Sequence, residues 1–464
     1  MRLCAGHYLL IAFFVITQCL LIILRNSLHG VSYYRLKRVH NLVNMEFMMV
    51  IGSMFIWKRV TEALNHLDPD KITPARFRWR TICFQDVARA TLFILLALSQ
   101  LSFLFYFFYV GSEPHILAQF SLIGLATYLH AVVFLVIAEL VHQFSTVSLK
   151  CGVLESQSRY IINSRHAYTY LSLFCALLFV LGGLYATLSD PVYTRVSIPL
   201  RNLHNGDVKV VLLTDLHIGP TVGQKRMQKI VELTNRLNPD IVAISGDLAD
   251  GFVKDLEGAA NPLCSLKSKH GVYFATGNHE YMHGNVDEWF AYLERCNVTV
   301  LHNSQQRILM ENGDRMCIAG TDDLFAARAH FPGHGMDAQR AVVGCHPGDA
   351  VVMLAHQPNA AQVMLDDPIV SKRVDLILSG HTHGGQMYLF VPVIYLVNAF
   401  ARSGSYSFRC QLLPRKGNGC FRGLYYNEPT GVYVYVSAGV NYFGPPIKMF
   451  GACEIIDITL KPVI

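Results

Sequence analysis

The chain carries little charge for its 464 residues. Asp, Glu, Lys and Arg make up only 16% of it, while hydrophobic residues make up 52%. Soluble domains carry about 25% charged residues. The deficit is concentrated in residues 1–187, which hold most of the long apolar runs, whereas the remainder has the composition of an ordinary globular domain. This uneven distribution predicts two units, of which the first lies in a membrane.

Several other features are absent. Lys and Arg form no long run and the net charge is only +6, so we expect no nucleic-acid partner. No two cysteines have the CxxC spacing, which excludes a zinc ribbon or a thioredoxin-like site. Twelve cysteines in a chain of this length are too few for a disulfide scaffold. Cys410 and Cys420 flank a loop rich in Gly, Pro and Lys and could pair if that loop faces an oxidising compartment.

Five apolar runs lie in the first 187 residues. A spanning helix needs about 20 apolar residues, and the last three runs reach that length. The first run is slightly short and precedes Arg25, which favours a signal anchor over a cleaved signal peptide. The second contains Glu46 and is the weakest, so an interfacial helix is the alternative there. The runs cover residues 8–24, 42–57, 90–110, 117–141 and 168–187.

The basic residues in the loops predict the orientation. With five spans, alternate loops hold eleven Lys and Arg residues on one side and four on the other. The richer side is expected in the cytosol, which places the second half of the chain in a lumen or outside the cell. The sequon Asn297-Val298-Thr299 is compatible with that side. Losing the second span would change this orientation.

Two acidic residues, Glu46 and Glu139, fall within or beside these apolar runs. Such residues can form a proton relay. No other charge accompanies them inside the runs, so positions at a membrane interface or in a contact between helices are the favoured interpretation.

The composition changes near residue 188. Ser189-Asp190-Pro191 ends the last apolar run, so residues 188–206 are predicted to form a linker and residues 207–464 a domain. Five apolar stretches in this domain have the length of buried strands and end in polar residues. Residues 225–237, which follow the first of these stretches, have apolar residues at helical spacing. The stretches are residues 208–214, 240–244, 272–275, 350–354 and 374–378.

Metal-binding side chains follow all five stretches. In the D-x-H pair, a near-extended backbone just past the strand would point Asp215 and His217 the same way. Open α/β sheets bind ligands beyond the carboxyl ends of their strands, so we expect the side chains to converge. Carboxylate, amide and imidazole together suit Mn, Fe or Zn. The candidate ligands are Asp215, His217, Asp247, Asn278, His356, His381 and His383.

Each motif alone has a structural explanation. A single D-x-H arises by chance, Gly-Asp and Gly-Asn are common turns, and a single histidine is more often a satisfied polar residue. The ordered set D-x-H, G-D-x-x-D, G-N-H-E, H and G-H-x-H, each after a strand, removes chance as an explanation. Seven ligands exceed the needs of one ion. We therefore expect two ions about 3.5–4 Å apart, bridged by Asp247 and a hydroxide that attacks phosphorus.

His279 follows the candidate ligand Asn278. Its imidazolium could protonate the leaving oxygen and offer charge to the phosphoryl group. A purely positional hydrogen bond is the alternative. Asp250 and Glu280 are expected to support the ligands rather than to bind metal.

These motifs, together with LAHQP and GHTHGGQ, resemble the calcineurin-like metallophosphoesterase superfamily over about residues 207–458. The resemblance implies a four-layer α/β/β/α sandwich. It also implies that His279 lies outside both metal shells. The resemblance further implies two sets of ligands that share Asp247. One ion would be held by Asp215, His217, Asp247 and His383. The other would be held by Asp247, Asn278, His356 and His381.

Aromatic and basic residues gather in residues 387–431, just after the last two histidines. They suit a phosphorylated amphiphile or a membrane interface, and an extra hairpin is the alternative. The sequence thus favours a membrane-anchored hydrolase of a phosphomonoester, phosphodiester or pyrophosphate, acting on a small molecule or a lipid. The rival is a membrane scaffold or transporter-like protein with a vestigial phosphoesterase domain. The complete ligand set and His279 favour the enzyme.

Overall fold

The computed structural model describes residues 5–28, 30–66, 75–387, 422–449 and 453–463. The chain divides into two compact units, called here the helical unit and the sheet unit. The helical unit comprises Met1–Phe103 and Phe120–Leu181, and the sheet unit comprises Leu104–Gln119 and Gly182–Ile464. A connection between two apolar helices therefore groups with the sheet unit, which the sequence did not indicate.

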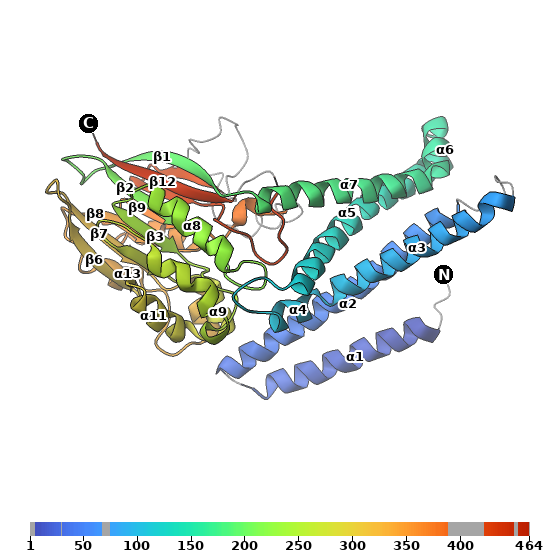
Figure 1. The fold of residues 1–464 in the computed structure, drawn as a ribbon, viewed down its shortest axis with the longest axis horizontal. Coiled ribbons are helices and arrows are strands. Elements are labelled where there is room, and N and C mark those ends of the chain that lie inside the picture. The colour runs from blue at the N-terminus through green and yellow to red at the C-terminus, as the bar shows by residue number, and fades with distance from the viewer. Residues whose placement is uncertain (1–4, 29, 67–74, 388–421, 450–452, 464) are drawn as a thin grey trace. The chain divides into compact units, whose positions relative to one another are not determined.

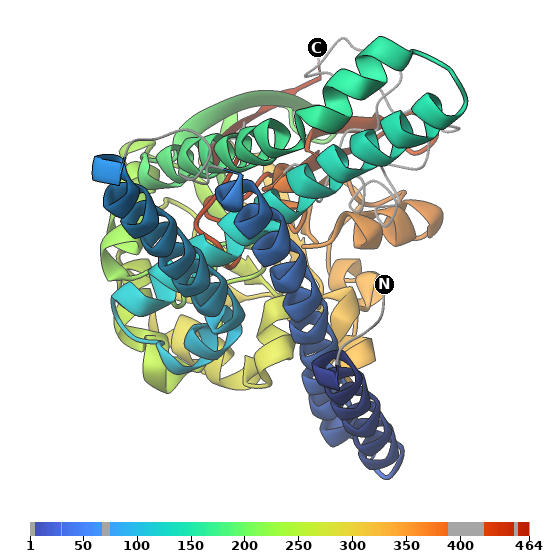
Figure 2. The same cartoon turned by 90° about the vertical axis from the view of Figure 1, so that its right-hand side faces the viewer.

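Long helices form the helical unit. Neighbours in sequence lie side by side in its first part, where α1 packs on α2 and α2 on α3 (Figures 1 and 2). The helices are α1 (Ala5–Asn26), α2 (Gly30–Asn65), α3 (Ala75–Gln100), α6 (Glu155–Asn163), and most of α5 (Ile116–Lys150) and α7 (Arg165–Leu188).

Three described helical stretches are long and apolar enough to cross a membrane: Val39–Asn65, Ile116–Lys150 and Arg165–Leu188. The run at 42–57, expected to be the weakest, thus lies in one of them. The run at 90–110 is divided between two helices, because α3 ends at Gln100 and α4 (Ser102–Phe108) begins beyond it, and whether it spans the membrane stays a prediction. Ser99 donates to the carbonyl of Leu95 and Ser102 to that of Ser99. Such local hydroxyl bonds compete with the regular helix ladder. The number of membrane passes stays a prediction.

Two six-stranded sheets make up the sheet unit (Figure 1). The first has the order β1-β12-β2-β3-β4-β5 and the second the order β10-β11-β9-β8-β7-β6. The first contains β1 (Val192–Leu200), β12 (Glu454–Pro462), β2 (Val208–Leu213), β3 (Ile241–Ser245), β4 (Val272–Ala275) and β5 (Val298–Val300). The second contains β10 (Gly423–Asn427), β11 (Val432–Val436), β9 (Leu376–Ser379), β8 (Ala350–Leu354), β7 (Arg315–Gly320) and β6 (Ser304–Leu309).

Both faces of each sheet are covered. Alternate residues of a strand point to opposite faces, so Val210 and Leu212 of β2 pack against the second sheet while Val211 and Leu213 contact the helices outside. Helices α8 (Gln224–Arg236), α9 (Val253–Ala260) and α11 (Val286–Arg295) cover the first sheet. Helices α13 (Ala338–Val342) and α14 (Pro358–Asp366) cover the second. The four-layer α/β/β/α prediction is confirmed.

The predicted linker 188–206 contains a strand. Residues Val192–Leu200 form β1, which pairs in parallel with β12 at the edge of the first sheet. Ile198 and Leu200 are buried, whereas Arg195 and Pro199 are not. An edge strand tolerates proline and a polar outer face, and those same residues made the segment read as a connector.

Two disulfides join segments of the sheet unit, Cys264 to Cys296 and Cys317 to Cys345. The sequence did not indicate either pairing, because connectivity depends on which segments the fold brings together. The pair suggested by the sequence, Cys410 and Cys420, lies outside the described residues, as does most of the aromatic and basic insert at 387–431.

Candidate metal centre

All seven candidate ligands lie just beyond strand ends, as expected. Asp215 and His217 follow β2, Asp247 follows β3, and Asn278 begins helix α10 (Asn278–His283) directly after β4. The histidines follow the second sheet, His356 after β8 and His381 and His383 after β9. The two sheets therefore contribute ligands to one edge of the sandwich.

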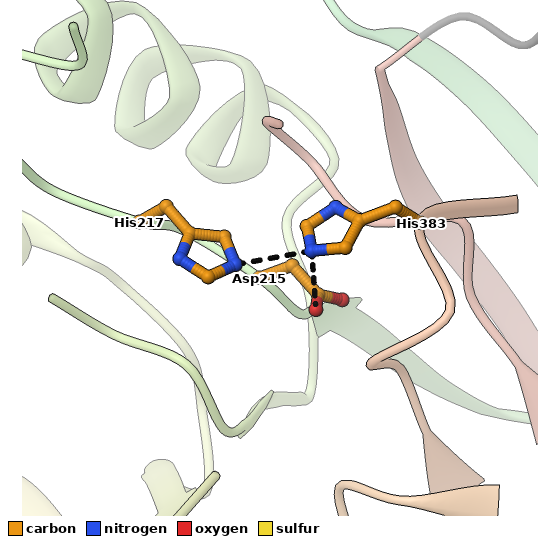
Figure 3. Close-up of side chains that lie close together, drawn as sticks. All are labelled: Asp215, His217 and His383. Atoms are coloured by element: carbon orange, nitrogen blue, oxygen red, sulfur yellow. Dashed lines mark hydrogen bonds and ion pairs between the residues drawn. The ribbon is translucent and has the colours of Figure 1, made fainter. Parts of the chain in front are cut away.

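One group of ligands comprises Asp215, His217 and His383 (Figure 3). The Nε2 atoms of His217 and His383 face each other at 3.1 Å, and His383 Nε2 lies 3.4 Å from Asp215 Oδ1. His217 Nδ1 donates to Asp250 Oδ1 at 3.0 Å. This bond holds the proton of a neutral His217 on Nδ1, so the Nε2 lone pair is turned toward the centre of the group.

The second group comprises Asp247, His356 and His381. His356 Nε2 lies 3.0 Å from Asp247 Oδ2, and its Nδ1 donates to the Ser245 carbonyl at 2.8 Å. The same Asp247 oxygen is 3.7 Å from His217 Nε2 in the first group. Asp247 thus lies between the two groups, where a carboxylate shared by two ions would have to be.

Asn278 tests whether these residues suit a cation. Its Oδ1 is buried and has no hydrogen-bond partner among the described residues. A buried acceptor without a partner costs about 1–3 kcal/mol, and a cation would relieve that cost. Carboxylate, amide and imidazole ligands also match the preferences of Mn, Fe and Zn. The donor set therefore fits two divalent ions.

The backbone at the ligands is strained. Five of the seven have left-handed φ values, namely Asp215 (56°), His217 (44°), Asp247 (52°), His381 (70°) and His383 (50°). The expectation of a near-extended D-x-H backbone was therefore wrong. Left-handed backbone is uncommon for residues other than glycine and marks places where function holds the chain in an unfavourable shape. Sharp reversals, rather than strand alternation, direct these side chains inward.

Gly246, which precedes Asp247, has a φ of 77°. A Cβ atom there would lie 2.6 Å from His356 Cγ. Only glycine lets the chain reverse this close to a ligand from the other sheet.

Two buried carboxylates hold the site in place. Asp250 Oδ1 accepts from Nδ1 of both His217, at 3.0 Å, and His279, at 2.6 Å. Glu280 accepts backbone N–H groups from Gly277 at 2.6 Å, Asp247 at 3.1 Å and Leu248 at 2.8 Å. Burial raises the pKa of Glu280, and the carboxylate of Asp247 raises it further. The supporting role expected of Asp250 and Glu280 stays a prediction, and these hydrogen bonds are the observation in its favour.

His279 lies against the ligands. Its backbone N–H donates to Asp247 Oδ1 at 2.9 Å, and its Nε2 is 4.0 Å from Asp247 Oδ2. Burial alone would lower the pKa of His279, but the carboxylates of Asp247 and Asp250 outweigh it and raise the pKa to about 9. These carboxylates favour the protonated imidazolium that a general acid needs.

No sequence motif marks two residues that lie beside the site, Phe443 and Lys448. The ring of Phe443 lies 5.4 Å from that of His217 and 4.8 Å from that of His279, centroid to centroid. Lys448 is buried and donates to the carbonyls of Ala438, Gly439 and Asn441. An apolar strand followed by polar residues, the pattern of the other ligand segments, also occurs at β11 and the residues after it. This pattern is the sequence signal for the loop.

Comparisons with known proteins support the same chemistry. Residues 208–385 match the family model described as calcineurin-like phosphoesterase. The chain is 46% identical to a Caenorhabditis elegans protein that carries a metallophosphoesterase name, over 94% of this chain and 92% of that one. It is 36% identical to the transmembrane protein with metallophosphoesterase domain of Danio rerio, over 91% of this chain and 90% of that one. This chain belongs to the calcineurin-like metallophosphoesterase family.

The membership confirms the resemblance seen in the motifs, and it makes the chain a member of a family of phosphoesterases that use divalent metal ions. The Bos taurus transmembrane protein with metallophosphoesterase domain is 32% identical over 94% of this chain and 93% of that one. Two relatives of this metallophosphoesterase, from Danio rerio and Bos taurus, are thus named as transmembrane proteins. A solved dimetal phosphatase from Danio rerio covers 50% of this chain and 87% of that one, at 12% identity and a TM-score of 0.30, too low to support a statement about this chain.

Proposed function

We propose that this metallophosphoesterase is a membrane-anchored hydrolase that cleaves a phosphomonoester, phosphodiester or pyrophosphate at a dinuclear metal centre. The observation that carries the proposal is the convergence of two groups of ligands on Asp247. The unpaired Asn278 Oδ1 adds support. A vestigial domain would not be expected to keep a complete donor set or the strained backbone that presents it.

The residues divide between the two ions as follows. Asp215, His217 and His383 would hold one ion, Asn278, His356 and His381 would hold the other, and Asp247 would contact both. Two such ions, when bound, supply a hydroxide nucleophile and positive charge for the phosphoryl oxygens. Asp250 keeps His217 in the tautomer whose Nε2 can bind metal, because a carboxylate accepts the proton on Nδ1.

His279 is proposed as the general acid. Its Nδ1 donates to Asp250 at 2.6 Å, which leaves Nε2 as the proton donor on the side of Asp247. Protonating the leaving oxygen from Nε2 breaks the P–O bond without releasing an alkoxide. The conjugate base formed there recovers its proton from water.

The catalytic side of the membrane is proposed to be a lumen or the cell exterior. Disulfides persist in oxidising compartments, and the sheet unit contains two of them. Asn297 of the sequon is exposed. Both observations agree with the excess of Lys and Arg in the loops assigned to the cytosol. The substrate is then a phosphorylated small molecule or lipid found on that side.

The test of activity uses the full-length chain in detergent micelles, loaded separately with Mn²⁺, Zn²⁺ or Fe²⁺. We expect hydrolysis of para-nitrophenyl phosphate or of bis(para-nitrophenyl) phosphate, with two ions bound at the centre. A folded protein that binds none of the three metals and hydrolyses neither compound would favour the rival scaffold or transporter-like protein.

The test of orientation uses sealed vesicles. A C-terminal tag should resist added protease, and Asn297→Gln should remove any glycan-dependent mobility shift. Digestion of the tag in intact vesicles would place the sheet unit in the cytosol and would contradict this part of the proposal.

A further inference from the structure

A second histidine–carboxylate cluster lies in the sheet unit and shares no residue with the candidate metal centre. His302, Asp322 and His334 each offer one ligand atom, and these three atoms lie within 4.8 Å of one another. We call them the His302 cluster. No sequence motif marks these residues, because they stand 20 and 12 residues apart in three different loops.

The cluster joins loops that belong to both sheets. His302 connects β5 of the first sheet to β6 of the second, Asp322 lies between β7 and α12 (Leu324–Ala329), and His334 lies between α12 and α13. An ion bound here would link the segment that connects β5 to β6, and thus the two sheets, to the loops before and after α12.

The distances suit one small cation. His302 Nδ1 lies 2.6 Å from Asp322 Oδ1, and His334 Nδ1 lies 3.5 Å from Asp322 Oδ2. Ligands of one tetrahedral Zn²⁺, bound at about 2.0–2.2 Å, stand about 3.4 Å apart. Small side-chain shifts would therefore admit the ion. The Asp322 carboxylate is fully buried between two imidazoles, a position where a cation would offset the cost of burying its charge.

Surrounding groups already hold the ligands in place. Asp287 Oδ1 accepts from His334 Nε2 at 3.2 Å, so Nδ1 of a neutral His334 is free of hydrogen and turned toward Asp322. A carboxylate on the far nitrogen is the usual partner of a metal-binding histidine. Asn303 Oδ1 accepts the backbone N–H of Asp322, and Asn303 Nδ2 donates to the Gly335 carbonyl. One side chain thus links all three loops.

We propose that the His302 cluster is a zinc site, separate from the dinuclear centre, that braces the loops beside it. Two imidazoles and one carboxylate, with water as the fourth ligand, are a set that Zn²⁺ accepts in enzyme sites built from two histidines and one carboxylate. The bracing would extend to helix α10, because the rings of Tyr281 and His334 pack edge to face with their centroids 5.5 Å apart. That helix begins with the ligand Asn278 and carries His279.

The experiment counts zinc in the purified full-length protein after loading with Zn²⁺ and removal of loosely bound metal. Wild type is expected to retain three equivalents by mass spectrometry. The double variant Asp247→Asn/His356→Ala, which cripples the dinuclear centre, should retain one. Adding His334→Ala to that background should remove the last equivalent, whereas His346→Ala, at an exposed histidine of the same unit, should leave it.

A second variant guards against misfolding. Asp322→Asn keeps the size of the side chain but removes its charge and one of its two acceptor oxygens, and should weaken zinc binding at this site at least tenfold. Circular dichroism of each variant reports whether it is folded. A folded Asp247→Asn/His356→Ala protein without zinc, or an Asp322→Asn protein that still binds it with wild-type affinity, would show that the cluster is only a hydrogen-bonded network and would overturn the proposal.

Discussion

The helical unit and the sheet unit both bury polar groups, but they satisfy them differently. In the helical unit many large apolar side chains are exposed, as a lipid-facing surface requires, while Arg59 is only 4% exposed. Arg59 donates to Thr169 at 3.1 Å and lies 3.9 Å from Glu139, which accepts from Arg165 at 2.8 Å. These contacts join α2, α5 and α7, and they favour the interpretation of Glu139 as a contact between helices rather than part of a proton relay.

In the sheet unit the buried polar groups leave capacity for a ligand. Asp215, Asp247 and four histidines converge on the same place, and Asn278 Oδ1 lacks a partner among the described residues. Lys448, the buried cation nearby, donates to backbone carbonyls instead. The charges around Glu139 are thus paired with one another across helices, whereas at the metal centre Asn278 Oδ1 lacks a partner that an added cation would supply.

The sharpest test of this contrast is Asp247→Asn. Because Asp247 lies between both groups, we expect loss of bound metal and a fall in turnover of at least ~10³-fold, or about 4 kcal/mol of transition-state stabilisation. Metal analysis and aryl phosphate hydrolysis measure both. Asp207→Asn, at an exposed aspartate of the same unit, is the control. Wild-type metal content in a folded Asp247→Asn protein would contradict the assigned bridging position.

His279→Ala separates proton transfer from metal binding. Turnover should fall by about 10²–10⁴-fold, the usual contribution of a general acid, while metal occupancy stays near that of wild type. Parallel measurement of kcat and bound metal decides between this role and a positional hydrogen bond. Full occupancy with near-normal turnover would exclude His279 as the acid.

Asp250→Asn should act through the histidines it orients. An asparagine can offer an N–H where His217 Nδ1 needs an acceptor, so the imidazole loses its fixed tautomer. We expect metal affinity to fall by about 10–100-fold, the usual effect of losing such a partner. Titration with Mn²⁺ or Zn²⁺ measures it. An unchanged affinity would mean that the strained backbone alone positions His217.

Glu139→Gln tests the other side of the comparison. It removes the carboxylate closest to Arg59 and Arg165, although Glu62 stays 4.0 Å from Arg165. We expect a loss of about 1–2 kcal/mol, less than for a fully buried pair because Glu139 and Arg165 are partly exposed. The melting temperature of the detergent-solubilised protein should fall, whereas metal content should not. A loss of metal with unchanged melting would contradict the separate roles of the two units.

The smallest effect concerns pH. Burial raises the pKa of Asp323 to about 7 from an ordinary value of 3.8, and its Oδ2 has no partner among the described residues. The folded state therefore holds this proton more tightly than the unfolded state, so stability is lost as pH rises from about 4 to about 7. Asp323→Asn should raise the melting temperature of the metal-depleted protein by a few degrees at pH 8, or about 1 kcal/mol. The gain in melting temperature should vanish below pH 4. An equal gain at pH 8 and below pH 4 would show that the raised pKa of Asp323 is not its cause.

Much of the sheet unit could be predicted because its strands are buried on both faces and read as continuous apolar runs. The strands β2, β3, β4, β8 and β9 lie within two residues of the stretches read from the sequence. The edge strand β1 was not predicted, because only one of its faces is buried and its residues therefore form no continuous apolar run. The break in the helix at Leu101 was not predicted, because the hydrogen bonds from Ser99 and Ser102 to nearby carbonyls do not change the hydropathy of the segment.

The sequence by itself determined which chemistry is available, because the identity and order of Asp215, His217, Asp247 and the later ligands already specify a metal-binding donor set. Tertiary structure alone decided how those groups meet. The left-handed turns, the sharing of Asp250 by His217 and His279, the loop held by Lys448 and the His302 cluster all join residues from distant segments. Such contacts depend on how two sheets pack and where their loops end, which no local pattern of residues encodes.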